Sequence, residues 1–297
     1  MANAVPLQAG VEPFPGYRLQ RRLGSGSFGE VWETIGLHGS PLALKFLPCD
    51  AKNNVAREIR SVQAISKLRH PHLIRVDRIW CFQNYLVIAM ELAEGTLADL
   101  LDSYLSEGKP AMLAEHVCLL LSEAAEALDF LNARRHHING GIVAIQHCDV
   151  KPSNLLLVQD MLKVADFSLS SSISSQVETR CRSGTLDYCA PEVFQGRLSS
   201  HTDQYALAVS YCMLRGGRPP FNDTPTSFQS NYTRPAPDLT MLSAAERPIV
   251  ARALQPVPQN RWPSCGQLMN GLSNVICRAA TGDAGKRKSG LRVRSRP

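Results

Sequence analysis

The sequence lacks the features of a membrane protein, a secreted protein and a disulfide- or metal-stabilised domain. No run reaches the roughly 18 apolar residues that a membrane-spanning helix needs. The start, MANAVPLQAG, has none of the basic residues of a signal peptide. The nine cysteines are odd in number and include no Cys-x-x-Cys pair, so we expect neither a disulfide framework nor a cysteine metal site. A reducing cytoplasm is the simplest location for such a chain.

Net charge is absent from most of the chain. The 297 residues carry a formal charge of +6, and residues 278–297 hold seven Lys or Arg against one Asp. Residues 1–277 are therefore neutral overall. We predict that residues 278–297 form a disordered tail or linker. Its charge is suited to contacts with polyanions such as nucleic acid or anionic lipid, although nothing in the sequence indicates a specific nucleic-acid site. A basic end of this kind is also typical of a linker within a longer protein.

The rest of the chain divides into parts with different patterns. Residues 1–16 contain three prolines and two glycines and are predicted to be a leader. Residues 17–90 contain short, apolar-rich strand patterns, interrupted by one helix pattern at 54–68. From Ala114 onward the pattern is helical, and the largely apolar helix at 203–216 is expected to be buried. This division indicates an α+β fold with a strand-rich N-terminal lobe, a larger helical C-terminal lobe and a cleft between them.

A glycine-rich turn lies in the strand-rich part. The stretch LGSGSFGEV places Gly24, Gly26 and Gly29 in the order G-x-G-x-x-G, followed by Val31. A plain hairpin is the simplest alternative. A dinucleotide-binding turn is disfavoured, because the residues that follow are typical of a strand where that fingerprint needs a helix. A strand–turn–strand hairpin can instead lie over phosphates, since residues without Cβ let backbone N–H groups come close.

A lysine follows in an apolar strand. Lys45 lies in the stretch LALKFL, where an unpaired ammonium group would be costly to bury. It therefore needs an anion, and Glu58 on the following helix is a candidate. The alternative is that the Lys45 side chain reaches out to water.

Polar residues gather in the stretch QHCDVKPSN and shortly after it. Asp149, Lys151 and Asn154 fall within six residues, and Pro152 disfavours a helix there. Asp166 follows at the end of a short strand. Asn154 and Asp166 carry oxygen ligands of the type that Mg²⁺ accepts, few enough to leave room for waters and substrate phosphates. Taken alone, Asp149 is better explained as a residue that caps a turn.

Taken in order, these motifs resemble those of the eukaryotic-like (Hanks-type) Ser/Thr protein kinases, which also occur in bacteria. GSGSFGEV resembles the kinase Gly-rich loop, LALK the strand that ends in the ATP lysine, and HCDVKPSN the catalytic loop H-R-D-x-x-x-x-N. DFS stands where the family has D-F-G, and APE closes the activation segment. The resemblance covers roughly residues 17–270. It implies a bilobal kinase domain at 17–277, with an N-lobe at about 17–90 and a C-lobe at about 94–277.

The resemblance also implies catalytic roles. Asp149 would be the base or would orient the substrate hydroxyl group, and Lys151 would steady the γ-phosphate. Lys45 would neutralise the phosphates of ATP and would pair with Glu58. Lys151, two residues after Asp149, together with Thr185, is similar to the Ser/Thr rather than the Tyr kinases.

Sites for Mg²⁺ and ATP follow from the same resemblance. Asn154 and Asp166 would bind Mg²⁺. Val31, Ala43 and Leu156 would enclose adenine. Backbone groups of Glu91 and Ala93, in a hinge beyond a gatekeeper-like Met90, would read the adenine edge. The full set of implied ATP-binding residues is Leu23, Gly24, Ser25, Gly26, Ser27, Phe28, Gly29, Val31, Ala43, Lys45, Met90, Glu91, Ala93 and Leu156.

Two further residues are implied to support the fold of the site. Asp203 resembles the buried helix Asp that braces the catalytic loop. Arg261 resembles the Arg that pairs with Glu192, the Glu of APE.

Three positions depart from the family pattern. Cys148 replaces the Arg before the catalytic Asp, and Ser168 replaces the Gly of D-F-G. The stretch 136–146 lengthens the approach to the catalytic loop, and its NGG sequence predicts a surface hairpin. We expect Ser168 to alter switching rather than to abolish metal binding, and Cys148 to make activity independent of phosphorylation in the activation segment.

The expected function is the ATP- and Mg²⁺-dependent transfer of the γ-phosphoryl group to Ser and Thr residues of protein substrates, including the chain itself. One alternative is an ATP-binding pseudokinase scaffold without useful transfer. Another is a phosphotransferase for small molecules, which the APE segment disfavours because it suits a docked peptide. We expect a cytoplasmic location, either for the chain itself or for it as the kinase domain of a longer protein.

Overall fold

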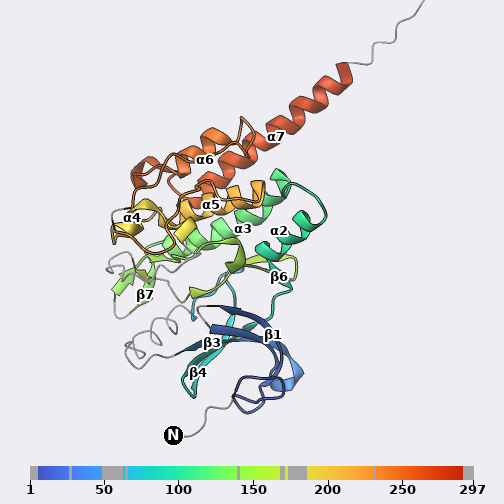
Figure 1. Cartoon of the computed structure of the whole chain (residues 1–297), viewed down its shortest axis with the longest axis vertical. Helices are drawn as coiled ribbons and strands as arrows, with labels where there is room; N and C mark the ends of the chain where they lie inside the picture. Colours follow the sequence, from blue (N-terminus) through green and yellow to red (C-terminus); the bar gives the residue numbers. More distant parts are fainter. Residues whose placement is uncertain are drawn as a thin grey trace, which may run out of the picture. The chain divides into compact units, whose positions relative to one another are not determined.

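Two units make up the chain, and neither is continuous in sequence. One comprises Met1–Gly95 and Leu156–Ser168, and the other comprises Thr96–Leu155 and Leu169–Pro297. We call them the N-terminal and C-terminal units. The computed structural model describes residues 6–26, 29–48, 63, 66–138, 141–167, 171–172, 186–230 and 232–289. The strand-rich first part and the helical second part that the sequence predicted are confirmed (Figure 1).

A five-stranded antiparallel sheet forms the centre of the N-terminal unit. Its spatial order is β1-β2-β3-β5-β4, and its strands are β1 (Arg18–Gly26), β2 (Gly29–Ile35), β3 (Pro41–Pro48), β4 (Val76–Phe82) and β5 (Tyr85–Glu91). The inner strands are the most apolar, and the side chains of Leu44, Phe46 and Val87 are fully buried. Burial of these side chains stabilises the sheet that carries Lys45.

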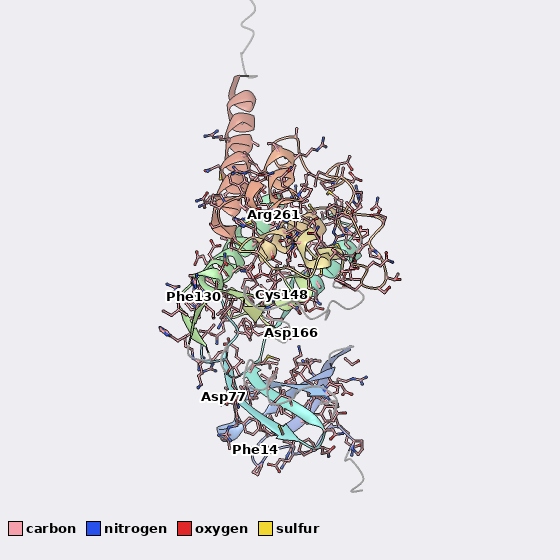
Figure 2. All side chains as sticks on the ribbon, turned by 90° about the vertical axis from the view of Figure 1, so that its left-hand side faces the viewer. Phe14, Asp77, Phe130, Cys148, Asp166 and Arg261 are labelled. Atoms are coloured by element: carbon pink, nitrogen blue, oxygen red, sulfur yellow. The ribbon has the colours of Figure 1, made fainter. Side chains whose placement is uncertain are left out.

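Residues 6–16 belong to this unit, which corrects the prediction of a separate leader. The amide of Gly10 donates to the carbonyl of Leu19 at 2.8 Å, and the amide of Leu19 donates to the carbonyl of Val11 at 2.9 Å. The ring of Phe14 lies 5.3 Å from that of Trp80, measured between centroids, and Figure 2 labels Phe14 in this unit. Gly and Pro residues turn the segment back, so that its apolar side chains pack on the sheet.

A second, smaller sheet carries the C-terminal portion of this unit. β10 (Leu155–Val158) and β11 (Met161–Val164) form a hairpin whose turn residues have positive φ. The amide of Val164 donates to the carbonyl of His72 at 2.9 Å, and the amide of Ile74 donates to the carbonyl of Val164 at 2.9 Å. These bonds hold the end of β11, and with it Asp166, against the segment that leads into β4.

Helices dominate the C-terminal unit. They are α2 (Leu97–Ser106), which follows the short strand β6 (Gly95–Thr96), then α3 (Ala114–Asn132), α4 (Pro191–Phe194), α5 (Thr202–Gly216), α6 (Arg247–Ala253) and α7 (Cys265–Ser289). Helices α3, α5 and α7 pack against one another (Figure 1). Nearly every residue of α5 is buried, as its apolar sequence predicted.

Helix α7 corrects the prediction for the tail. It continues past residue 277 to Ser289, so that residues 278–289 are helical rather than disordered. Ala, Lys and Arg are common here and all have high helix propensity, which the charge-based prediction did not take into account.

Short strands surround the catalytic loop. β7 (His136–Ile138) pairs antiparallel with β8 (Gly141–Val143), which confirms the predicted hairpin; its tip, residues 139–140, lies outside the described residues. β9 (Ile145–Gln146) pairs with β12 (Ser171–Ser172). The backbone that enters the activation segment is therefore paired with the strand that leads into the catalytic loop.

Several sequence predictions fall outside the described residues. They concern nearly all of the helix at 54–68 with Glu58, the loop residues Ser27 and Phe28, and Ser168 and Thr185. Within the described part of the chain, no helix combines the length and the apolar character needed to cross a membrane.

Candidate active site

The glycine-rich turn joins β1 to β2 as a hairpin, in which Gly24 pairs with Val31 and Gly26 with Gly29. A strand follows the turn, which excludes a dinucleotide-binding turn because that motif leads into a helix. Gly29 has φ +117°, and a Cβ there would lie 1.8 Å from the carbonyl oxygen of Phe46, so packing on β3 requires glycine. A Cβ on Gly24 would meet nothing within 4 Å. Its glycine is therefore not required by the protein's own packing, which suits a backbone that a ligand approaches. Of the other implied residues here, Leu23 and Ser25 are exposed on β1.

Lys45 forms a buried ion pair. Its side chain is only 11% exposed, and its Nζ lies 2.5 Å from Oδ2 of Asp166, whose side chain is 16% exposed. The alternative that Lys45 reaches out to water is therefore wrong. Asp166 has φ +69°, a left-handed conformation that is uncommon outside glycine. Pairing of Lys45 with Glu58 stays a prediction, because Glu58 lies outside the described residues.

The residues predicted to enclose adenine lie on neighbouring strands of the N-terminal unit. Val31 is opposite Lys45 in the β2–β3 register, and buried Ala43 is opposite Met90 in the β3–β5 register. Leu156 on β10 packs against the same small apolar cluster as Met90 and Ala93, which is built on Ile74, Val158 and Ala165. An apolar wall of this kind suits a flat aromatic base.

The two residues of the predicted hinge differ in their contacts: the side chain of Glu91 is bound to the protein, and the backbone of Ala93 is available to a ligand. Oε1 of Glu91 accepts from the amide of Arg75 at 2.7 Å and from Nζ of Lys163 at 2.8 Å. These contacts hold the side chain of Glu91 to the protein itself. Among the described residues, neither backbone polar group of Ala93 has a hydrogen-bond partner. An available donor and acceptor on one residue fit the edge of a nucleotide base.

Asp149 lies in a loop of the C-terminal unit and is 2% exposed. Nζ of Lys151 lies 3.0 Å from its Oδ1, and Nδ2 of Asn154 donates to its Oδ2 at 2.8 Å. Pro152 begins a 3₁₀ turn that brings Asn154 back, and Nδ2 of Asn154 also donates to the carbonyl of Asp149 at 2.8 Å. Because the amide nitrogen of Asn154 is engaged, its Oδ1 is left as an oxygen ligand.

Asp203 on α5 holds the backbone of this loop. Its carboxylate accepts from the amide of His147 at 2.6 Å and from the amide of Cys148 at 2.9 Å. This arrangement confirms the brace that the sequence predicted. Burial raises the pKa of Asp203, although the charge of His147 and the two amides oppose that effect. Cys148 has φ +67°, so the brace also holds the backbone before Asp149 in a conformation that few side chains adopt.

Glu192 and Arg261 form the predicted pair after the activation segment. Nη1 and Nη2 of Arg261 donate to Oε1 and Oε2 of Glu192 at 2.9 and 2.7 Å, and both residues are buried. Burial alone would raise the pKa of Glu192, but the hydrogen bonds and charge of Arg261 hold that pKa below its usual value. Bidentate pairs of this kind fix geometry as well as charge.

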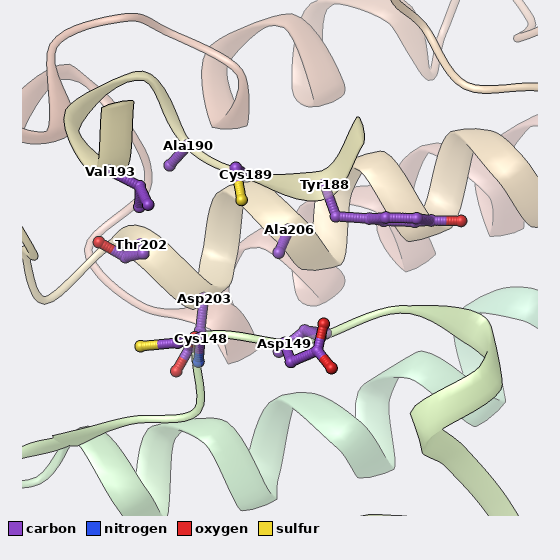
Figure 3. Close-up of a pocket in the computed structure, with 10 residues that line it drawn as sticks. Cys148, Asp149, Tyr188, Cys189, Ala190, Val193, Thr202, Asp203 and Ala206 are labelled. Carbon is purple, nitrogen blue, oxygen red and sulfur yellow. The ribbon is translucent and has the colours of Figure 1, made fainter. Parts of the chain in front are cut away.

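Asp149 and the segment that precedes α4 line the same pocket in the C-terminal unit. Its lining includes Asp149, Tyr188, Cys189, Ala190 and Cys148. Figure 3 shows the carboxylate of Asp149 across the pocket from the ring of Tyr188, while the side chain of Cys148 points away from that carboxylate. Burial, and then the nearby negative charges of Asp187 and Asp149, raise the pKa of Tyr188, so its hydroxyl stays neutral.

Comparison with known proteins identifies the family. The model of the protein kinase domain matches residues 17–277. The chain belongs to the protein kinase family. It is 31% identical to the serine/threonine-protein kinase PknF of Mycobacterium tuberculosis, over 92% of this chain and 58% of that protein. It is 30% identical to the CBL-interacting protein kinase 4 of Oryza sativa subsp. japonica, over 84% of this chain and 56% of that protein.

A third relative is the serine/threonine-protein kinase PknJ of Mycobacterium bovis, which is 27% identical over 90% of this chain and 46% of that protein. The chain thus spans about half the length of the curated relatives it matches. The resemblance seen in the sequence, and the bilobal kinase fold class that it implied, are confirmed.

Sequence reasoning missed two features of the site. It did not find Asp166 as a partner of Lys45, because Lys45 lies on β3 whereas Asp166 follows β11 of the other sheet, and no local spacing links them. It also missed Arg234, which contacts the segment lining the pocket from a stretch of irregular backbone without helical or strand periodicity.

Proposed function

We propose that this kinase domain transfers the γ-phosphoryl group of ATP to Ser and Thr hydroxyl groups of protein substrates and of itself. The observation that supports this proposal most is the burial of Asp149 and the set of contacts around it. It is a buried carboxylate whose backbone is braced by Asp203, and Lys151 and Asn154 lie beside its two oxygens. Such a group is held ready to accept the hydrogen bond, and then the proton, of a substrate hydroxyl.

The residues present fit ATP. The apolar wall with Ala43, Met90 and Leu156 suits adenine, and the backbone of Ala93 offers an available donor and acceptor. The open face at Gly24 admits phosphates, and Lys45 supplies a buried positive charge. We therefore propose that the implied ATP-binding residues, from Leu23 to Leu156, hold the nucleotide and that Glu58 supports Lys45.

The donor set also fits Mg²⁺. Asp166 offers a carboxylate and Asn154 an amide oxygen, the hard oxygen ligands that Mg²⁺ takes together with waters and phosphates. Bound Mg²⁺ would neutralise charge that develops on the transferring phosphoryl group. Lys151 would steady the γ-phosphate while Asp149 orients the hydroxyl.

We further propose that activity does not depend on phosphorylation of the activation segment. Cys148 offers neither a positive charge nor a donor fork where the family has Arg. The start of the segment is instead held by backbone pairing of β12 with β9, which needs no phosphate. We also propose that residues 6–16 form part of the kinase domain together with residues 17–277. The proposed location is the cytoplasm.

An ATP-binding scaffold without transfer is the competing function. Incubation of the purified chain with γ-labelled ATP and Mg²⁺ separates the two. We expect label on Ser or Thr of the chain or of a generic basic protein, and loss of that label when Mg²⁺ is chelated. Measurable ATP binding without any transfer would favour the scaffold.

A further inference from the structure

Arg234 is a buried cation that binds backbone carbonyls and aromatic rings. It is 8% exposed and lies in the irregular stretch between α5 and α6. Among the described residues, no carboxylate lies within ion-pair distance of its guanidinium group. Burial of a cation without an anion is costly, so other groups have to compensate for the lost water.

Carbonyl oxygens provide the first part of that compensation. Nη2 of Arg234 donates to the carbonyl of Leu186 and lies 2.9 Å from the carbonyls of Asp187 and of Cys189. Nε reaches the carbonyl of Cys189 at 3.2 Å, and Nη1 donates to Oγ1 of Thr224 at 2.9 Å. All three nitrogen atoms of the guanidinium group are thus hydrogen-bonded, two to one short backbone segment and one to a hydroxyl group.

Aromatic rings provide the second part. The guanidinium carbon of Arg234 lies 4.6 Å from the ring centroid of Phe221, 5.5 Å from that of Phe194 and 5.7 Å from that of Tyr232. Rings at these distances attract a cation and shield it from water. Arg234 is therefore confined in position as well as stabilised.

The segment that Arg234 holds faces the proposed catalytic carboxylate. Leu186–Tyr188 forms the 3₁₀ turn η4, and Tyr188 and Cys189 line the pocket that also contains Asp149 (Figure 3). Just downstream, Arg261 holds Glu192. Two arginines thus anchor two successive stretches, and only the second was evident from the sequence.

We propose that Arg234 is a positioning residue that fixes the segment Leu186–Cys189 beside Asp149 so that a protein substrate can dock there. This proposal rests on the proposed function for the identity of the docked substrate. A planar guanidinium group can span three carbonyls and a hydroxyl, whereas an ammonium group is a point charge without that fork. Arg234→Lys therefore keeps the charge but loses the geometry.

The first arm of the test is kinetic. Arg234→Lys is compared with wild type and with Arg218→Lys, which alters a half-buried ion pair to Asp238 in the same irregular stretch. The probe is a Ser- and Thr-containing basic peptide. We expect Arg234→Lys to raise the KM for this peptide by about tenfold or more, while the KM for ATP stays within about twofold. Arg218→Lys should change neither value.

The second arm does not depend on activity. Hydrogen exchange at the amides of residues 187–190 should be at least about tenfold faster in Arg234→Lys than in wild type, and unchanged in Arg218→Lys. If Arg234→Lys does not fold, Thr224→Val removes one hydrogen bond and keeps the charge. It should then show smaller changes in the same directions, about threefold in peptide KM.

The outcomes separate this proposal from the proposed function. Wild-type protein that transfers no phosphate contradicts the proposed function, and the exchange arm alone then decides whether Arg234 holds the segment. Unchanged exchange at residues 187–190 overturns the positioning role. Unchanged peptide KM in an active enzyme overturns the docking role, and so does an equal loss of ATP and peptide affinity, which would indicate a merely structural residue.

Discussion

Asp149 and Asp166 are both expected to serve phosphoryl transfer, but their surroundings differ. Asp149 is 2% exposed and sits in a loop whose amides are bonded to Asp203. Asp166 is more exposed, has φ +69° and lies 2.5 Å from Lys45. The first carboxylate is held in place by the backbone around it. The second is engaged by a cation that nucleotide phosphates would also attract.

This difference indicates different roles for the two carboxylates. A carboxylate fixed before substrate arrives suits the orientation of a hydroxyl group, because no reorganisation is then needed. A carboxylate and a lysine that neutralise each other suit a site whose partners rearrange when Mg²⁺ and a triphosphate bind. Variants in the two regions should therefore fail in different ways.

Asp166→Ala should give the widest loss. It removes the proposed metal ligand and leaves the ammonium of Lys45 without that partner. We expect the affinity for Mg·ATP to fall at least about tenfold and turnover to fall at least about 10²-fold. Nucleotide titration and steady-state kinetics measure the two effects. Asp160→Asn, which alters an exposed carboxylate in the β10–β11 turn, is the control. Equal Mg·ATP affinity in Asp166→Ala and wild type would rule out Asp166 as a ligand.

Glu192→Gln should reduce stability more than nucleotide affinity, because it leaves Arg261 buried without its partner. We expect Tm at pH 7 to fall by roughly 5–10 °C, whereas Glu107→Gln, in the exposed pair with Lys109, should shift it by less than about 1 °C. Thermal melts followed by circular dichroism provide the measurement.

The pH dependence of that difference has a definite sign. The pKa of Glu192 is lowered in the folded protein relative to its ordinary value of 4.5. Its ionised form therefore stabilises the fold above pH 4.5, and this contribution is lost as the pH falls through the folded-state pKa. The gap in Tm between wild type and Glu192→Gln should narrow below pH 4.5. A gap that stays constant there would show that ionisation of Glu192 does not stabilise the protein.

Phosphatase treatment should give the smallest effect. Since Cys148 cannot pair with a phosphate, we expect the treated enzyme to keep at least about a third of its activity. Replacement of six activation-segment residues by Ala should have an equally small effect; they are Ser171, Ser172, Ser174, Ser175, Thr179 and Ser183. A tenfold or greater loss on phosphatase treatment, restored by preincubation with ATP, would show that phosphate controls the segment despite Cys148.

The sequence predicted those parts of the molecule that local spacing encodes. Local patterns predicted the buried helix α5 and the hairpin β7–β8, and the resemblance to the protein kinases implied the pair of Arg261 with Glu192; all three are present. Each depends on an apolar pattern, a turn signal or a motif whose order along the chain is informative.

Other contacts were not predictable, because irregular segments make them. Residues 6–16 pack on the sheet although their prolines and glycines indicated a leader. The ion pair joins Lys45 on β3 to Asp166 in the segment after β11, and Arg234 contacts the Leu186–Cys189 segment from a stretch without periodicity. Such contacts depend on the folded path of the backbone, which composition and spacing do not encode.

We propose that Asp149 handles the substrate hydroxyl while other residues hold the nucleotide. The most direct test is Asp149→Asn, with Asp102→Asn, at an exposed position of α2, as the control for the lost charge. Transfer of labelled phosphate and ATP affinity are measured on the same preparations. We predict that turnover falls by roughly 10²-fold to 10⁴-fold while ATP affinity stays within a few-fold of wild type. Near wild-type turnover in Asp149→Asn would contradict the account.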